Sequence, residues 1–420
     1  MENPILAMIP SGYKGQTATV PQVYSVLPSD GSGDFDFDRA NGLATRINKD
    51  GLIEEVANDT PRLDYKNSTC PSLLLESEST NLQAYSQDFN NAVWFKLRTT
   101  VTSNNTTSPS GELNADKIQR TSTNASYIQD GFTKNASQIQ YTTSVFVKQG
   151  EGDYLALRVQ GNFFERIDLR FQFSTKSFIY TNEAGIAVLN STSVTEYSNG
   201  WLKLSYSFLS DTQSSLNNYF SARATSGNVD SNDTSSTAFV YLWGCQVEQS
   251  TFGSSYIPTT TIQTRFADVC GNAGNADLFD SNEGAMFVDI QKSFKDSSFG
   301  RISISDESSA NRVVIGKENS NTQFRMFVAH TNGTIDAQKY TDVNFDVRNK
   351  FIITWKLNDF KFYQNGSLIH SDTSGSIPIG LSKFAFNENN LGSQDFLGKI
   401  NGVRYYNKVL TQAEAIKLTT

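Results

Sequence analysis

The chain has 420 residues and a formal net charge of −8, with only 38% hydrophobic and 19% charged residues. The difference is made up by Ser, Thr, Asn and Gly, which is typical of a chain rich in turns and short strands. No apolar run approaches the ~20 residues that span a membrane, and residues 1–4 lack the start of a signal peptide. The acidic balance gives no attraction to nucleic acid. We therefore expect two to four domains, without membrane insertion or a nucleic-acid partner.

Cysteine and histidine are both scarce. An odd set of three cysteines, Cys70, Cys245 and Cys270, indicates neither a disulfide framework nor a zinc site. Two histidines, His330 and His370, leave little for metal–histidine or histidine-base chemistry. We expect each of them to be a surface or packed side chain, and we predict no catalytic, metal-binding or cofactor-binding residues among them.

Most of the negative charge lies in the first fifth of the chain. Residues 1–80 hold 12 acidic and 6 basic side chains, and part of this excess is the run Asp34-Phe35-Asp36-Phe37-Asp38. The first interpretation is a solvated strand edge whose aromatic side chains point inward. The second is a carboxylate cluster for Ca²⁺, although the run lacks the Gly and the distal Glu of an EF-hand loop. We therefore predict no cofactor, with Ca²⁺ as the one alternative.

Proline marks residues 1–80 as different from the rest. Six of the nine prolines lie before residue 72, and proline cannot donate to a sheet ladder. We expect residues 1–80 to be an extended segment with few regular strands, which packs against a later domain or a partner subunit.

From about residue 85 the pattern changes to strands. Apolar and polar residues alternate with period two over residues 139–147, 155–159, 167–173 and 202–208. This alternation is typical of half-buried antiparallel strands. Residues 238–247 are apolar on both faces, as in a central strand, and turn-rich segments occur at 103–111 and 226–236. Residues 81–268 are therefore predicted to form a β-sandwich.

A second strand series follows a small and polar run at residues 271–276. Strands are expected at residues 286–290, 301–305, 312–316, 323–329, 351–357 and 400–406. Asn365-Gly366 predicts a hairpin with a type I′ turn, and residues 411–418 predict one short helix with Glu414 in its first turn. Residues 269–420 are predicted to be a second β-sandwich, so the fold class is all-β.

A search for catalytic motifs finds no nucleophile elbow, phosphate-binding loop or metal-binding pair. A glycosidase needs two facing carboxylates. Glu165 and Asp168 are odd-spaced on a strand, and Asp306 and Glu307 are adjacent, so each pair points to opposite faces. An acid pair assembled from distant strands stays open. The four tryptophans, Trp94, Trp201, Trp243 and Trp355, could stack on sugars, but we predict core packing for all of them.

Three parts of the chain resemble known families. Residues 34–55, 61–65, 70–76, 80–82, 85–89 and Trp94 resemble a segment of tailed-bacteriophage head-fibre and tail-fibre proteins. Residues 199–201, 244–248 and 254–259 resemble a carbohydrate-binding-module-like jelly roll. Residues 362–366, 396–400, 403–407 and 410–411 resemble a concanavalin A-like (laminin G-like) domain.

The resemblance implies a non-enzymatic virion appendage, a head or tail fibre or decoration protein that adheres to host-surface or environmental glycans. It implies a location on the virion surface, a homotrimer, and other virion proteins bound through residues 1–80. It brings no catalytic or glycan-binding residues to assign. The alternatives are a purely structural capsid or tail subunit without a ligand, and a polysaccharide depolymerase. The nearly neutral domains after residue 80 favour neutral or mildly charged glycans.

Overall fold

The computed structural model describes residues 3–10, 35–40, 43–66, 68–293, 298–320 and 322–420. Asp34 of the acidic run and part of the Pro-rich segment lie outside these residues. The described chain holds 31 strands and one α-helix of eight residues, which confirms the all-β prediction. No helix among these residues is long and apolar enough to cross a lipid bilayer.

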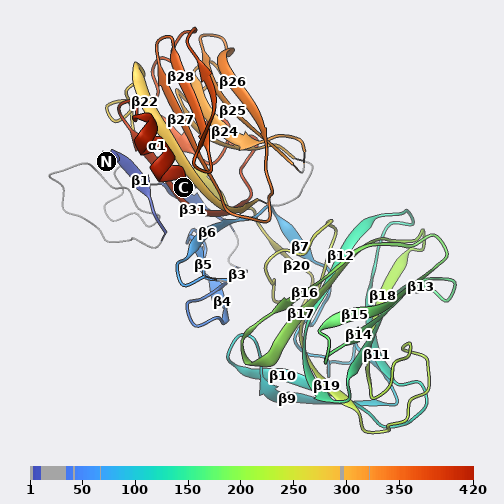
Figure 1. Cartoon of the computed structure of the whole chain (residues 1–420). Coiled ribbons are helices and arrows are strands. Elements are labelled where there is room, and N and C mark those ends of the chain that lie inside the picture. Colours follow the sequence, from blue (N-terminus) through green and yellow to red (C-terminus); the bar gives the residue numbers. More distant parts are fainter. Residues whose placement is uncertain (1–2, 11–34, 41–42, 67, 294–297, 321) are drawn as a thin grey trace. The chain divides into compact units, whose positions relative to one another are not determined.

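Two compact units divide the chain (Figure 1). Unit 1 comprises residues 1–42, 56–77 and 266–420, and unit 2 comprises residues 43–55 and 78–265. The first 80 residues are thus shared between the two units, and each unit is described by itself below.

Unit 2 is built on two antiparallel six-stranded sheets. The first has the order β16-β17-β12-β19-β10-β9, with β16 Val188–Glu196, β17 Trp201–Leu209, β12 Gln140–Glu151, β19 Phe239–Glu248, β10 Leu113–Arg120 and β9 Thr99–Thr107. The second has the order β15-β14-β13-β18-β11-β8, with β15 Ser177–Ala184, β14 Glu165–Gln172, β13 Tyr154–Asn162, β18 Ser215–Arg223, β11 Tyr127–Thr133 and β8 Phe95–Leu97. Two small pairs add β3 Ala44–Ile47 with β4 Ile53–Val56, and β7 Ser79–Asn81 with β20 Gln263–Arg265.

The core of unit 2 lies between its two large sheets, because the inward residues of both contribute to one apolar cluster. The predicted central strand is β19, which lies between β12 and β10. A second cluster covers the other face of the first sheet, where Trp201, Trp243 and Tyr256 pack with Ile47 and Ile53 of the β3–β4 hairpin. All four tryptophans of the chain are buried, as predicted.

Unit 1 is a sandwich of one large and one smaller antiparallel sheet. The large sheet has the order β29-β28-β27-β22-β31-β6-β5, with β29 Ser367–Asp372, β28 Asp359–Gln364, β27 Asn349–Lys356, β22 Glu283–Ser293, β31 Gly398–Tyr406, β6 Ser72–Leu75, β5 Arg62–Asp64 and β1 Leu6–Met8 beside β31. The smaller sheet has the order β26-β25-β24-β23-β30, with β26 Thr334–Asp342, β25 Gln323–His330, β24 Arg312–Lys317, β23 Gly300–Ser305 and β30 Lys383–Ala385. A small pair joins β2 Asp36–Asp38 to β21 Val269–Gly271.

The core of unit 1 fills the space between these two sheets. The helix α1, Gln412–Thr419, packs its Ala415 and Leu418 against the other face of the large sheet. Thr411 caps this helix in a reciprocal capping box with Glu414, the acid predicted for its first turn. The β28–β29 hairpin turns at Asn365 and Gly366, both at positive φ, which confirms the type I′ turn.

Two sequence predictions need correction. Residues 103–107 were expected to be a turn but belong to strand β9, where a bulge with Asn104 at positive φ accommodates the polar run. The Pro-rich segment was expected to have few regular strands, yet the structure describes six strands of three or four residues between Leu6 and Leu75. Pro61 and Pro71 lie directly before β5 and β6, where a missing N–H breaks no ladder bond.

Candidate functional site

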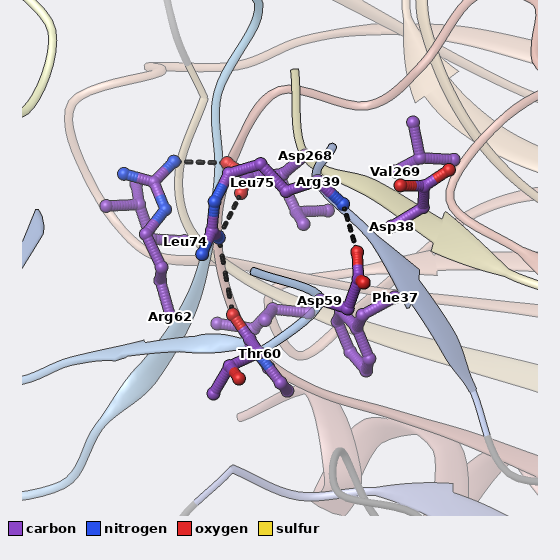
Figure 2. Close-up of a pocket in the computed structure, with 12 residues that line it drawn as sticks. Phe37, Asp38, Arg39, Asp59, Thr60, Arg62, Leu74, Leu75, Asp268 and Val269 are labelled. Carbon is purple, nitrogen blue, oxygen red and sulfur yellow. Dashed lines mark hydrogen bonds and ion pairs between the residues drawn. The ribbon is translucent and has the colours of Figure 1, made fainter. Parts of the chain in front are cut away.

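The pocket shown in Figure 2 is a buried ion-pair cluster of unit 1. The Asp268 carboxylate accepts from Arg39 Nη1 at 3.1 Å and forms an ion pair with Arg62, whose Nη1 also donates to Glu76 at 2.7 Å. Burial alone lowers the pKa of Arg62, but Asp268 and Glu76 outweigh it and the pKa is raised. Arg39 adds bonds to the carbonyls of Thr60 and Val56.

This cluster is too small to hold a sugar. Its cavity volume is about 10 Å³, which is room for one water molecule. Its role is structural, because Asp268 binds residues at the ends of β2, β5 and β6 that lie 229, 206 and 192 residues away in sequence.

The residues singled out for catalysis or metal binding do not form a site. Asp168 is buried between Arg158 and Arg166 at 2.6 and 3.0 Å, whereas Glu165 accepts from the Ile186 amide. His330 pairs with Asp336, and the His370 ring lies 5.5 Å from that of Phe362. All three cysteines are free, with Cys245 and Cys270 buried.

The acidic run follows its first interpretation where it is described. Phe35 is fully buried, and its ring lies 5.6 Å from Phe384 and 5.4 Å from Phe386, while Asp36 and Asp38 face solvent. Among the residues that the structure describes, no three His, Cys, Asp or Glu side chains come together as a metal site.

The surface with the chemistry for ligand contact is the outer face of the smaller sheet in unit 1, the face turned away from the core. Strands β24, β25 and β26 lie side by side in Figure 1. Registered neighbours on this face form three cross-strand rows, which run from β23 to β26. They are Arg301-Gly316-Arg325-Tyr340, Ser303-Val314-Phe327-Gln338 and Ser305-Arg312-Ala329-Ile335.

One half of this outer face is covered by the segment 386–396. Ser303 Oγ donates to the Asn387 carbonyl at 2.7 Å, and the Arg301 amide donates to the Gln394 carbonyl at 2.8 Å. Arg312 Nη2 lies 3.4 Å from a carboxylate oxygen of Glu388. Ser303 and Val314 are fully buried as a result.

The other half is open to solvent. Tyr340 is 45% exposed and Gln338 is exposed, while Arg325 is half-buried beside them. Arg325 donates from Nε and Nη2 to Gln338 Oε1 at 3.1 and 2.6 Å, and its guanidinium carbon lies 5.1 Å from the Tyr340 ring centroid. Such contacts hold the guanidinium in one place without neutralising it.

Arginine gathers on this face. The guanidinium of Arg312 lies 5.2 Å from the Phe327 ring centroid and that of Arg325 lies 4.6 Å from it. Burial lowers the pKa of Arg312, and Arg301 and Arg325 lower it further, whereas Glu388 and Asp306 oppose this effect. Three cations therefore share one electrostatic field on the outer face.

Gly316 makes room for the first row. A Cβ on Gly316 would lie 2.4 Å from the Gly300 carbonyl oxygen and 2.7 Å from Arg301 Cδ. Without that atom, Arg301 lies close to β24, where its Nη1 donates to the Lys317 carbonyl at 3.0 Å and its Nη2 pairs with Glu318 at 2.8 Å.

Unit 2 offers a second exposed aromatic group, at the turn between β13 and β14. Phe163 and Phe164 are 59% and 75% exposed with ring centroids 5.3 Å apart, and the Arg166 guanidinium lies 4.7 Å from the Phe163 ring. Gln160 and Arg166 are registered neighbours at this turn, but Arg166 is paired with Asp168 at 3.0 Å, unlike Arg325 in unit 1.

The sequence assigned no glycan-binding residue. The strands β24 and β25 were predicted, and their alternation could have placed Arg312 and Arg325 opposite the core. Outward Val314 and Phe327 obscure that alternation, because they make both faces of the strands apolar.

Comparisons with known proteins identify the domain that carries the outer face. Residues 291–415 match the family described as the concanavalin A-like lectin/glucanases superfamily, laminin G type. These residues form a concanavalin A-like domain, as the sequence predicted. The chain is also similar to the β-glucanases of Bacillus amyloliquefaciens (34% identity over 93 residues) and Bacillus subtilis (33% over 93 residues). Each match covers 21% of this chain and 37% of the enzyme, so the chain matches little more than a third of these relatives.

Solved structures show weaker similarity. The CBM40 domain of the Ruminococcus gnavus IT-sialidase, bound to α2,3-sialyllactose, is 16% identical over 35% of this chain and 92% of its own, with a TM-score of 0.31. Domain 4 of the arabinanase AbnA from Geobacillus stearothermophilus, in complex with arabinotriose, is 12% identical to this chain. The match covers 38% of this chain and 77% of that domain, with a TM-score of 0.30. Scores this low carry no conclusion about this chain.

Proposed function

We propose that this protein binds carbohydrate, and that the open half of the outer face in unit 1 is its contact surface. The observation that carries the proposal is the placement of exposed Tyr340 beside Gln338 and Arg325 on two paired strands of the concanavalin A-like domain. The family's description as lectins and glucanases supports it, as does the similarity to β-glucanases.

The three side chains supply complementary interactions. An aromatic ring offers an apolar surface to the C–H groups of a sugar, and its phenol offers a hydrogen bond. The Gln338 amide and the Arg325 guanidinium supply donors for hydroxyl oxygens. Because both strands belong to a packed sheet, the three groups are held at fixed spacing before the ligand arrives.

Within this proposal the outer face binds glycan without cleaving it. Hydrolysis of a glycosidic bond needs two carboxyl groups across the bond, and none of the twelve residues in the three rows is acidic. Of the nearby acids, Glu318 and Glu388 are engaged by Arg301 and Arg312. Asp342, exposed two residues beyond Tyr340 on β26, is a single carboxyl, whereas hydrolysis needs two.

The similarity to β-glucanases favours a depolymerase as the second candidate function. Incubating the full chain with β-glucan and assaying reducing ends tests it. Release of reducing sugar would establish the enzyme, and its absence beside retained binding would support adhesion.

We also propose that the protein is a virion appendage, a head or tail fibre or decoration protein that works as a trimer. The support is the resemblance of residues 34–94 to bacteriophage fibre proteins. Imaging of phage particles with a labelled antibody tests the location, and sedimentation tests the trimer. A protein absent from particles, or a monomer at micromolar concentration, would contradict the respective part.

The binding proposal is tested with a glycan array probed by the fluorescently labelled full chain. Tyr340→Ala should lower affinity by about tenfold, as expected for an aromatic anchor. Leu357→Ala, which removes another exposed apolar side chain from unit 1, should leave binding unchanged. No hits on the array, together with normal particle assembly, would favour a purely structural subunit.

A further inference from the structure

The charges of the outer face are unevenly distributed over it. The chain is acidic and residues 270–420 are neutral overall, with 16 acidic and 16 basic side chains. The outer face holds three arginines, Arg301, Arg312 and Arg325. Its acids are Glu318 and Glu388, Asp306 near Arg312, and the exposed Asp342 two residues beyond Tyr340 on β26. The arginines are therefore not in excess, and Arg325 differs from the other two in its place among these charges.

Glu318 and Glu388 lie toward the covered half of the face. Glu318 pairs with Arg301 at 2.8 Å and Glu388 with Arg312 at 3.4 Å. In the part of the chain that the structure describes, no carboxylate forms an ion pair with Arg325, which is bonded to the neutral Gln338 instead. The open half thus presents, among its described residues, a cation that forms no ion pair, with the carboxylate of Asp342 further along β26.

Arg325 also has donors to spare. A guanidinium has five N–H groups, and the bonds to Gln338 use one on Nε and one on Nη2. The remaining three can take a carboxylate or a sulfate, for which the planar guanidinium fork is well suited. Tyr340, its registered neighbour, lies where the ring of the same sugar residue could stack.

We propose that the open half of the outer face selects an acidic glycan, whose carboxylate or sulfate binds Arg325 while the sugar ring stacks on Tyr340. This inference rests on the proposed carbohydrate binding and narrows its ligand class. It also revises the sequence-based preference for neutral glycans, because that preference followed from net charge alone.

The buried arginines strengthen the selection. Neither Arg301 nor Arg312 has an acid partner for all of its guanidinium nitrogens: Nε of both, and Nη1 of Arg312, are buried without a hydrogen-bond partner. An anion at Arg325 would gain favourable interaction with these two partly compensated charges, since the protein screens charge less than water does.

A matched series of polymers tests the inference with the full chain. Dextran, carboxymethyl-dextran and dextran sulfate share one backbone and differ in charge. We expect a charged polymer to bind more tightly than dextran, and raising NaCl to weaken that binding. Arg325→Gln should lower affinity for the charged polymer by about tenfold or more, since a hydrogen-bonded charge is lost.

Arg348→Gln is the matched control. Arg348 is 52% exposed and pairs with Asp289 on the large sheet. Arg348→Gln removes one positive charge from the chain, as Arg325→Gln does. It should leave the affinity unchanged. Equal losses in both variants would show nonspecific polyanion binding and overturn the inference.

Two further outcomes separate this inference from the proposed function. Binding to dextran as tight as to its charged derivatives, lost in Tyr340→Ala but not in Arg325→Gln, would overturn the acidic ligand and keep carbohydrate binding. Absence of binding to both charged polymers would also overturn the inference. In that case the glycan array alone would test whether the protein binds carbohydrate.

Discussion

The guanidinium of Arg223 lies 3.7 Å from the carboxylate of Asp233, and both side chains are buried in unit 2. Arg223 also donates to the carbonyls of Thr225, Asn228 and Asn232, at 3.1, 3.0 and 2.6 Å. Asp233 accepts from several amides of the same loop. Burial lowers the pKa of Arg223 to about 10, so it is protonated at neutral pH and serves as an internal cation that organises residues 224–236.

Removing this cation should destabilise unit 2. Arg223→Met leaves the loop carbonyls buried without their donor and Asp233 without the nearer of its two arginines, since Arg120 lies 4.0 Å away. Breaking a buried pair in this way costs about 3–5 kcal/mol. Urea unfolding followed by tryptophan fluorescence measures it. Lys176→Met is the control, because Lys176 and Glu196 pair at 2.7 Å on the surface, where a pair contributes about 1 kcal/mol or less. Similar costs for the two variants would contradict the assigned role.

Asp116 should make stability depend on pH. Burial raises its pKa to about 6, although the amides of Asn104 and Phe89 donate to it at 3.0 and 2.8 Å and oppose the rise. The folded state therefore binds the proton more tightly than the unfolded chain, whose Asp pKa is about 3.9. The stability of wild type relative to Asp116→Asn should fall as pH rises from about 4 to about 6, and level off above.

Unfolding of both proteins at pH 5 and pH 7 measures this difference. Other titrating groups are common to the two proteins and cancel. A difference that stays constant between pH 5 and pH 7 would show that Asp116 has an ordinary pKa.

The cap of the C-terminal helix should contribute measurably to unit 1. Thr411 Oγ1 accepts from the Glu414 amide at 3.3 Å, and the Glu414 carboxylate accepts from the Thr411 amide at 3.1 Å. Thr411→Ala should cost about 1 kcal/mol in urea unfolding. Thr373→Ala is the control, because Thr373 is an exposed loop residue outside the regular elements. An equal cost for the two would indicate that the cap is not used.

Sequence reasoning predicted local structure better than it predicted partners. The type I′ turn at Asn365-Gly366 and the acid Glu414 in the first turn of the last helix depend on adjacent residues, so the sequence alone indicates them. Arg62 and Asp268 are 206 residues apart. The sequence around either residue gives no sign that the two form an ion pair. Their pairing depends on how β5 and the residues before β21 meet in the folded unit.

The outer face shows the same limit for function. Arg325 and Tyr340 become neighbours only through the register of β25 and β26. Arg301 and Arg312 join them through β23 and β24, and the cover over one half comes from residues 386–396. The alternation within one strand places a residue on a face, but it does not say what lies beside it.

The final prediction concerns Gly316, which lies between Arg301 and Arg325 in one row. Its backbone is not at positive φ, so Gly316→Ala tests space rather than conformation. The added Cβ would collide with the Gly300 carbonyl oxygen and Arg301 Cδ at 2.4 and 2.7 Å. Overpacking of this kind costs about 1–3 kcal/mol, and it should also displace Arg301 and weaken glycan binding.

Gly253→Ala is the matched control, since its Cβ would meet no atom closer than 3.5 Å. Urea unfolding measures the stability of both variants, and the glycan array measures their binding. If Gly316→Ala unfolds and binds like wild type, β24 can shift to accommodate the added Cβ. The close approach of Arg301 to Gly316 would then not be required for the stability or the binding of the outer face.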